Sequence, residues 1–247
     1  MDTVTTFQSL CKSKKHDKYQ VLYFILYFMN IRGFFIKIIQ LSAYWPLLFL
    51  FRIFFNFKVK GTDNLEKAGT SFILAANHVS YLDPVSVCIA IPFRLKYIPL
   101  FYMASDYFYR VLFFYRFIGG IRARMGRDLE LSSRPLIEKL DQGERVVIFP
   151  EGGINRGGLK RRPHRGISYV AAKSNKLILP LKIESNLDGA VSVLGGSIID
   201  LLTGKHWIKM IFGKPFKIDE TIGKIPESLS ELRKASEDVF KRIEMTK

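Results

Sequence analysis

Short apolar runs alternate with helical segments over most of this chain, and this alternation limits the fold more than any other feature. Apolar runs of about four to eight residues between turn signals predict strands that are buried on both faces. We expect strands at Phe57–Lys60, Ser71–Ala76, Lys96–Pro99, Gly119–Ala123, Arg145–Phe149, Leu177–Ile183 and Trp207–Phe212. We expect helices at Pro84–Ile91, Ser105–Tyr115, Leu129–Leu140, Gly166–Ser174 and Leu229–Ile243. The prediction is an α/β fold, in which a mostly parallel sheet is covered by helices on both faces.

The N-terminal part of the chain has a different character. Val21–Met29 and Gly33–Phe55 are apolar and aromatic, and a polar tail with several lysines precedes them. A membrane-spanning helix needs about 20 apolar residues, but polar residues and a proline interrupt this region: Arg32, Lys37, Gln40, Pro46 and Arg52. Two helices that lie in or dip into one leaflet fit these interruptions better than a clean span, and a pair of soluble core helices is the alternative. We therefore divide the chain into residues 1–57, a basic tail with membrane-associated helices, and residues 58–247, an α/β domain.

The charge balance points to an anionic partner. The chain carries 38 Lys and Arg residues against 22 Asp and Glu residues, a formal net charge of +16. A membrane surface, a phosphorylated substrate and nucleic acid all fit that charge. The aromatic residues gather in the N-terminal apolar segment instead of alternating with cations, which favours lipid and argues against nucleic acid. The two cysteines give no disulfide framework, and His16, His164 and His206 lack partners at metal-ligand spacing, so we predict no metal site.

Polar residues with catalytic potential follow the apolar run Ser71–Ala76. His78 and Asp83 come directly after it, with four residues between them. Reactive groups collect at the carboxyl ends of strands in open α/β sheets. A histidine beside an aspartate is the minimum equipment for a general base with an orienting partner. Asp83-Pro84 also has the pattern of a helix N-cap followed by proline, so the alternative is that Asp83 only caps the next helix and His78 is structural.

A second polar turn, Phe149-Pro150-Glu151-Gly152, follows the apolar run Val146–Ile148. The H-x-x-x-x-D element from His78 to Asp83, together with F-P-E-G about seventy residues later, resembles the glycerolipid acyltransferases typified by lysophosphatidic acid acyltransferase. The resemblance runs from roughly residue 59 to residue 216. The N-terminal aromatic segments also resemble the membrane-docking helix pair of that family. By this resemblance, residues 58–247 form an acyltransferase catalytic domain.

The resemblance implies a reaction and a location. His78 would take the proton from an acceptor hydroxyl, and the resulting alkoxide would attack an acyl thioester directly while Asp83 holds the imidazole. The donor would be acyl-CoA or acyl carrier protein as co-substrate, with no cofactor. The acceptor would be a lysophospholipid, first of all lysophosphatidic acid, giving phosphatidic acid at the cytoplasmic leaflet of a bacterial inner membrane. The alternatives are a different lyso-lipid acceptor, a hydrolase in which His78 activates water, and a non-catalytic basic membrane-binding protein.

The resemblance also implies substrate-binding residues. Arg124, with Arg122 as the next candidate, would clamp the acceptor phosphate, and Glu151 would bind or orient its glycerol portion. Gly152 would permit close backbone approach. Arg165 matches a cation-glycine pair, and Pro180 would form a wall of the acyl or acceptor pocket. For these residues the plainer alternatives are solvated arginines, a simple turn at Gly152 and strand termination at Pro180.

The chain departs from the family pattern at two places. Gly153-Ile154 stands where Thr-Arg usually follows the F-P-E-G turn, so Arg156, two positions later, would take over the phosphate contact. Ser105 stands where a lysine is common. Both departures concern the choice of substrate more than the chemistry, so acceptors other than lysophosphatidic acid stay open, including an amino-acid-containing lyso-lipid.

Overall fold

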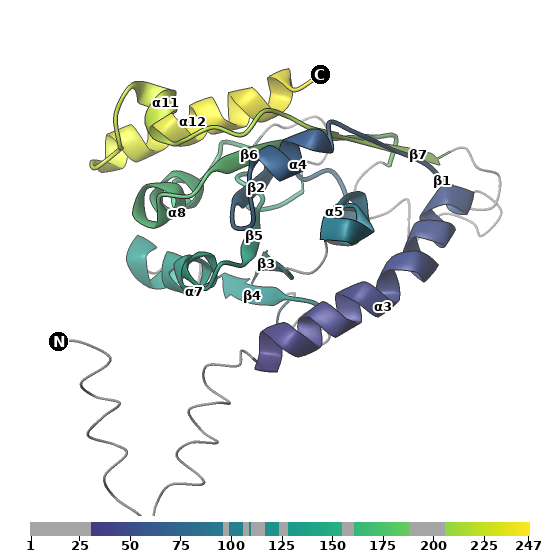
Figure 1. The fold of residues 1–247 in the computed structure, drawn as a ribbon. Coiled ribbons are helices and arrows are strands. Elements are labelled where there is room, and N and C mark those ends of the chain that lie inside the picture. Colours follow the sequence, from purple (N-terminus) through teal and green to yellow (C-terminus); the bar gives the residue numbers. More distant parts are fainter. Residues whose placement is uncertain are drawn as a thin grey trace, which may run out of the picture.

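The structure, a computed structural model, describes residues 31–95, 99–105, 109, 117–123, 128–154, 161–187 and 206–247. Its centre is a seven-stranded sheet with the strand order β1-β7-β6-β2-β5-β3-β4 (Figure 1). The strands are β1 Phe55–Lys60, β2 Ile73–Ala76, β3 Leu100–Ser105, β4 Gly120–Ala123, β5 Arg145–Ile148, β6 Ile178–Ser185 and β7 His206–Phe212. Neighbouring strands are parallel, except that β6 and β7 are antiparallel.

Helices cover both faces of this sheet. They are α3 Ile31–Phe54, α4 Asp63–Lys67, α5 Asp83–Ala90, the short 3-10 helix η1 Phe93–Leu95, α7 Leu129–Asp141, α8 Gly166–Ser174, α11 Asp219–Ile222 and α12 Leu229–Met245. One hydrophobic cluster joins the sheet to α3, α4 and α5, and a second joins it to α7, α8 and α12. Strand β2 supplies both, because successive side chains alternate: Leu74 lies in the first cluster and Ile73 in the second. Figure 1 shows the same two layers, so the predicted α/β class is confirmed.

Most predicted elements lie where the apolar pattern placed them, with differences of one to two residues at their ends. Of the strand predicted at 96–99, only Pro99 is described; it lies outside any strand, and β3 begins at Leu100. Pro99 itself has no N–H to donate to a strand ladder. The helix predicted from Ser105 is wrong at its start, where β3 still continues. Apart from Tyr109, which is helical, the rest of that helix lies outside the described residues, as do residues 21–29 and residues 96–98.

Helix α3 has one buried side and one exposed side, both largely apolar. The buried stripe recurs every three or four residues and consists of Ile36, Gln40, Tyr44, Leu48 and Phe51. The exposed side consists of Phe34, Phe35, Ile38, Trp45, Phe49, Leu50 and Ile53. Gly33–Phe54 is long and apolar enough to cross a membrane by length and composition. An exposed apolar surface of this kind indicates a membrane or protein contact rather than open water.

Candidate active site

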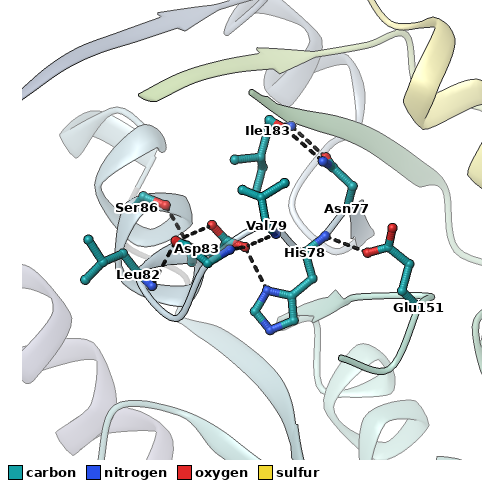
Figure 2. Close-up of polar contacts among 9 residues, drawn as sticks. Asn77, His78, Val79, Leu82, Asp83, Ser86, Glu151 and Ile183 are labelled. Atoms are coloured by element: carbon teal, nitrogen blue, oxygen red, sulfur yellow. Dashed lines mark hydrogen bonds and ion pairs between the residues drawn. The ribbon is translucent and has the colours of Figure 1, made fainter. Parts of the chain in front are cut away.

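The turn after β2 brings His78 and Asp83 into direct contact. His78 Nδ1 lies 2.7 Å from Asp83 Oδ2 (Figure 2). The side chain of His78 is 15% exposed and that of Asp83 is 2% exposed, so the imidazole reaches solvent while the carboxylate does not. Because an ionised carboxylate only accepts hydrogen bonds, this contact places a proton on Nδ1 and leaves the lone pair on Nε2. Figure 2 shows the second ring nitrogen pointing away from Asp83.

Asp83 also organises the backbone of the turn. Its Oδ2 accepts hydrogen bonds from the N–H groups of Val79 at 2.7 Å and Ser80 at 2.9 Å, and its Oδ1 accepts one from the Ser80 hydroxyl at 3.1 Å. The alternative of a simple helix N-cap is therefore wrong: the N-cap of α5 is Leu82, without a side-chain cap, and Asp83 is the first helical residue. Its carboxylate turns back along the chain, where one side chain holds both the turn and the imidazole.

The imidazole of His78 is fixed from a second direction by Phe149. The two rings are stacked, with centroids 4.3 Å apart and an angle of 23° between their planes. Phe149 follows β5, which is paired with β2 in parallel, so the carboxyl ends of neighbouring strands supply both rings. A ring held by a carboxylate at Nδ1 and by an aromatic face has little rotational freedom. It presents Nε2 as a proton acceptor in a defined direction.

Glu151 supports the backbone of His78. Its side-chain Oε2 accepts a hydrogen bond of 2.7 Å from the His78 N–H, and the residue is 1% exposed (Figure 2). A buried carboxylate needs such partners, because an unsatisfied charge in the interior is costly. The two predicted turns thus meet through this hydrogen bond, which joins residues 73 positions apart.

Asn77 fastens the start of the same turn to β6. Its amide Nδ2 donates to the Ile183 carbonyl at 2.8 Å, and the Ile183 N–H donates to Asn77 Oδ1 at 2.7 Å (Figure 2). The β2–β6 ladder ends with Ala76 opposite Leu181, so the amide continues the pairing by one further step. Sequence reasoning assigned no role to Asn77 or Phe149. Asn77 directly precedes His78, and Phe149 lies two residues before Glu151. Their places beside predicted residues were the only signal in the sequence.

The basic segment before α8 folds against the second turn. The backbone of Gly152 is left-handed, with φ of +66°, and a Cβ there would lie 2.7 Å from Cδ2 of the His164 ring. A Cβ on Gly153 would lie 3.2 Å from an Arg161 guanidinium nitrogen. The group that approaches Gly152 is the His164 ring, and the role of Gly152 in substrate binding stays a prediction. The Arg161 guanidinium thus lies beside Gly153, whereas the next residue, Ile154, is buried.

The other arginines predicted to bind substrate lie on different elements. Arg122 is half-buried on β4, and since its neighbour Ile121 points into the α7 cluster, alternation directs Arg122 to the α5 side. Arg165 precedes α8 and lines an open hollow of about 410 Å³ with residues of α12. Arg124 and Arg156 lie outside the described residues.

Pro180 does not end its strand, because β6 continues to Ser185. Its ring carbon Cγ would lie 2.8 Å from a Cβ on Gly213, and its carbonyl accepts a hydrogen bond from Gly213 N at 2.8 Å. These contacts lie beside the C-terminal end of α12, since Thr246 also borders Gly213. Ser105 is the last residue of β3. Within the described ranges, no group of three or more His, Cys, Asp or Glu residues is placed to hold a metal ion.

Known proteins are similar to this chain in sequence and in fold. The family model described as Acyltransferase matches residues 56–184, a range that contains both turns. A 1-acyl-sn-glycerol-3-phosphate acyltransferase from Borreliella burgdorferi is 24% identical over 125 residues, which are 51% of this chain. The match spans about half of that curated relative, 50% of its length.

A solved structure has a similar fold. The crystal structure of the 1-acyl-sn-glycerophosphate (LPA) acyltransferase PlsC from Thermotoga maritima superimposes with a TM-score of 0.55 at 21% identity, covering 84% of this chain and 76% of that one. At this identity the similarity concerns the fold. The family model covers more than half of the chain and includes the His78–Asp83 turn and the Glu151 turn, and the chain therefore belongs to the acyltransferase family.

Proposed function

We propose that the protein is an O-acyltransferase that moves a fatty acyl group from a thioester donor to the hydroxyl of a lysophospholipid. The observation that carries this proposal is the 2.7 Å contact between His78 Nδ1 and the buried carboxylate of Asp83. That contact leaves Nε2 as the proton acceptor, at the end of a strand where substrates bind in open α/β sheets. Membership of the acyltransferase family supports the same reaction.

In the proposed reaction, the acceptor oxygen attacks the thioester carbonyl while Nε2 of His78 takes the hydroxyl proton. The new C–O bond forms first, and the C–S bond then breaks as the tetrahedral intermediate collapses. The imidazolium returns its proton to the departing thiolate, so an ester and a free thiol leave. Asp83 stabilises the imidazolium without taking the proton. General-base assistance of this kind contributes a factor of about 10²–10⁴ in rate.

Lysophosphatidic acid is the first acceptor that we propose. The names of the two similar proteins support it, because both are acyltransferases of 1-acylglycerol phosphate. The acceptor phosphate would meet Arg122, Arg124 and Arg161, of which Arg161 lies against Gly153 in the second turn. Arginine suits this role because its planar guanidinium binds phosphate through two parallel hydrogen bonds. Arg156 and Arg165 would add positive charge at the same end of the sheet.

The membrane is the proposed place of the reaction. The exposed aromatic side of α3 and the apolar length of Gly33–Phe54 support association with a bilayer. Cytoplasmic thioesters would reach the site from the cytoplasmic leaflet, in bacteria that of the inner membrane. The donor, acyl-CoA or acyl carrier protein, is anionic in both forms and suits the net charge of +16.

The test is an assay of the full chain with a labelled acyl thioester, vesicles and a panel of lysolipids, followed by mass spectrometry of the products. We expect an acylated lysolipid that appears with wild-type protein and disappears with His78→Ala. Thioester cleavage that proceeds equally with and without a lysolipid would replace this proposal by a hydrolase. Binding of lipid without either product would leave a membrane-binding protein.

A further inference from the structure

Gln40 stands out on the buried side of α3. It is 7% exposed and lies between Ile36 and Tyr44 in the stripe that faces the sheet. An amide in such a stripe costs free energy unless its hydrogen bonds are formed. An apolar residue of similar size would pack at this position without that cost, so the presence of an amide here calls for an explanation.

The amide of Gln40 is fully used by two backbone segments. Its Nε2 donates to the Leu100 carbonyl at 2.8 Å and to the Ile118 carbonyl at 3.1 Å, and the Leu100 N–H donates to its Oε1 at 3.0 Å. Leu100 begins β3, and Ile118 lies two residues before β4. One side chain of α3 therefore joins the starting points of two neighbouring strands.

The two segments approach each other closely at this point. Strands β3 and β4 pair from Tyr102 opposite Gly120, so in the same register Leu100 would lie opposite Ile118, two positions earlier. Gly119 has a φ of +103°, and a Cβ there would lie 2.3 Å from the Leu100 carbonyl oxygen and 3.3 Å from Gln40 Nε2. The amide takes over hydrogen bonds that the strand ladder does not make here.

Strand β4 is a short edge strand, so a connection at its start matters for its position. It lies at the edge of the sheet, is four residues long and pairs with β3 alone. It carries Arg122. A shift at Ile118 would thus move Arg122 relative to the fixed turn at His78.

We propose that Gln40 is a positioning residue that links the seating of α3 on a bilayer to the position of Arg122 on β4, one of the arginines proposed to bind the acceptor phosphate. The inference rests on the proposed function and adds a path from the membrane to the site. The outer side of α3 would contact lipid, while Gln40 on the inner side holds β3 and β4 in register. Membrane contact then improves acceptor binding without changing the histidine.

The experiment compares wild type with Gln40→Leu, in the full chain. Loss of the amide removes the link to Ile118, so we expect the acceptor KM to rise about tenfold, the change in a binding constant that one well-formed hydrogen bond produces. The donor KM stays within about twofold, and vesicle cosedimentation is unchanged. Ser42→Ala is the matched control, because its exposed hydroxyl contacts carbonyls of Ile38 and Ile39 in the same helix. It should behave as wild type.

A second arm tests the link to the membrane. With a short-chain acceptor that stays in solution, adding acceptor-free vesicles should lower the acceptor KM of wild type and leave that of Gln40→Leu unchanged. If Gln40→Leu does not fold, Gln40→Glu decides in the same assays, since it keeps the oxygen that accepts from Leu100 and loses the N–H groups.

Three results would overturn the inference: a lower melting temperature with both KM values unchanged, an equal rise of acceptor and donor KM, or the same vesicle response in variant and wild type. Each leaves the proposed function intact, provided that wild type transfers acyl groups and His78→Ala does not. Absence of transfer by wild type would instead remove the proposed function.

Discussion

Two turns follow the neighbouring parallel strands β2 and β5, and they are held in different ways. The turn after β2 is closed by its own carboxylate, because Asp83 binds groups of His78, Val79 and Ser80. The turn after β5 depends on other parts of the chain: its Pro150 carbonyl accepts from His164 N at 2.7 Å, and Glu151 binds His78. Most of the contacts inside the first turn are local, although Glu151 and Ile183 also bind its first residues. The second turn gathers distant segments around it.

The largest effect that this comparison predicts is for His78→Ala. The variant loses the proposed base, so kcat should fall by about 10²–10⁴-fold or more. The side chain makes no backbone contact that holds the turn, and the melting temperature should therefore change little. His206→Gln on β7 is the matched histidine control and should retain turnover. Activity of His78→Ala near the wild-type level would show that the first turn is structural.

The second largest effect is expected for Asp83→Asn. An amide places an N–H group where four donors now converge on one carboxylate, so the turn loosens and the hold on the imidazole weakens. We expect kcat to fall by about 10²-fold and the free energy of unfolding to fall by about 1–3 kcal/mol. Steady-state kinetics and urea unfolding measure the two effects, with Asp63→Asn on the exposed start of α4 as control. Normal turnover with reduced stability would leave Asp83 only its role in the backbone of the turn.

Glu151→Ala separates the two interpretations of the second turn. If Glu151 acts by holding the His78 N–H, its loss leaves a buried donor without a partner, at a cost of about 1–3 kcal/mol. We then expect kcat to fall while the acceptor KM stays close to wild type. Glu151→Gln keeps an acceptor oxygen, so its kcat should lie between those of wild type and Glu151→Ala. A raised acceptor KM with unchanged kcat would instead support direct binding of the glycerol portion.

Gly152→Ala should have the smallest effect. Alanine in left-handed backbone costs about 1–2 kcal/mol, and its Cβ would force the His164 ring to move. Gly69→Ala is a matched control, because Gly69 has a φ of +80° with no atom within 4 Å of a Cβ. The difference in unfolding free energy between the two variants measures the His164 contact. Equal losses would show that His164 contributes nothing to the second turn.

Sequence reasoning succeeded where the deciding contacts are local. Asp83 lies five residues from His78, and strand and helix geometry carries the chain back across that distance. The helix patterns of α7, α8 and α12 succeeded for the same reason, since a periodic apolar face specifies a helix wherever it docks. The helix predicted from Ser105 failed at its start, because the propensity of the residues does not reveal that the pairing of β3 with β4 continues to Ser105.

Long-range contacts decided the features of the site and the sheet that the sequence did not reveal. The role of Glu151 as support for His78 depends on a hydrogen bond across 73 residues, and that of Gln40 on one across 60. The antiparallel pairing of β6 and β7 and the contact of Pro180 with Gly213 depend on where strands meet.

By itself, the sequence determined the α/β class, the apolar helix before it and the His78–Asp83 pair. These features follow from periodicity and from neighbours within one turn. Only the tertiary structure decided which way Glu151 points, which arginine reaches Gly153 and what holds the start of β4. Each of these depends on segments far apart in the chain, whose meeting is set by the packing of the whole sheet.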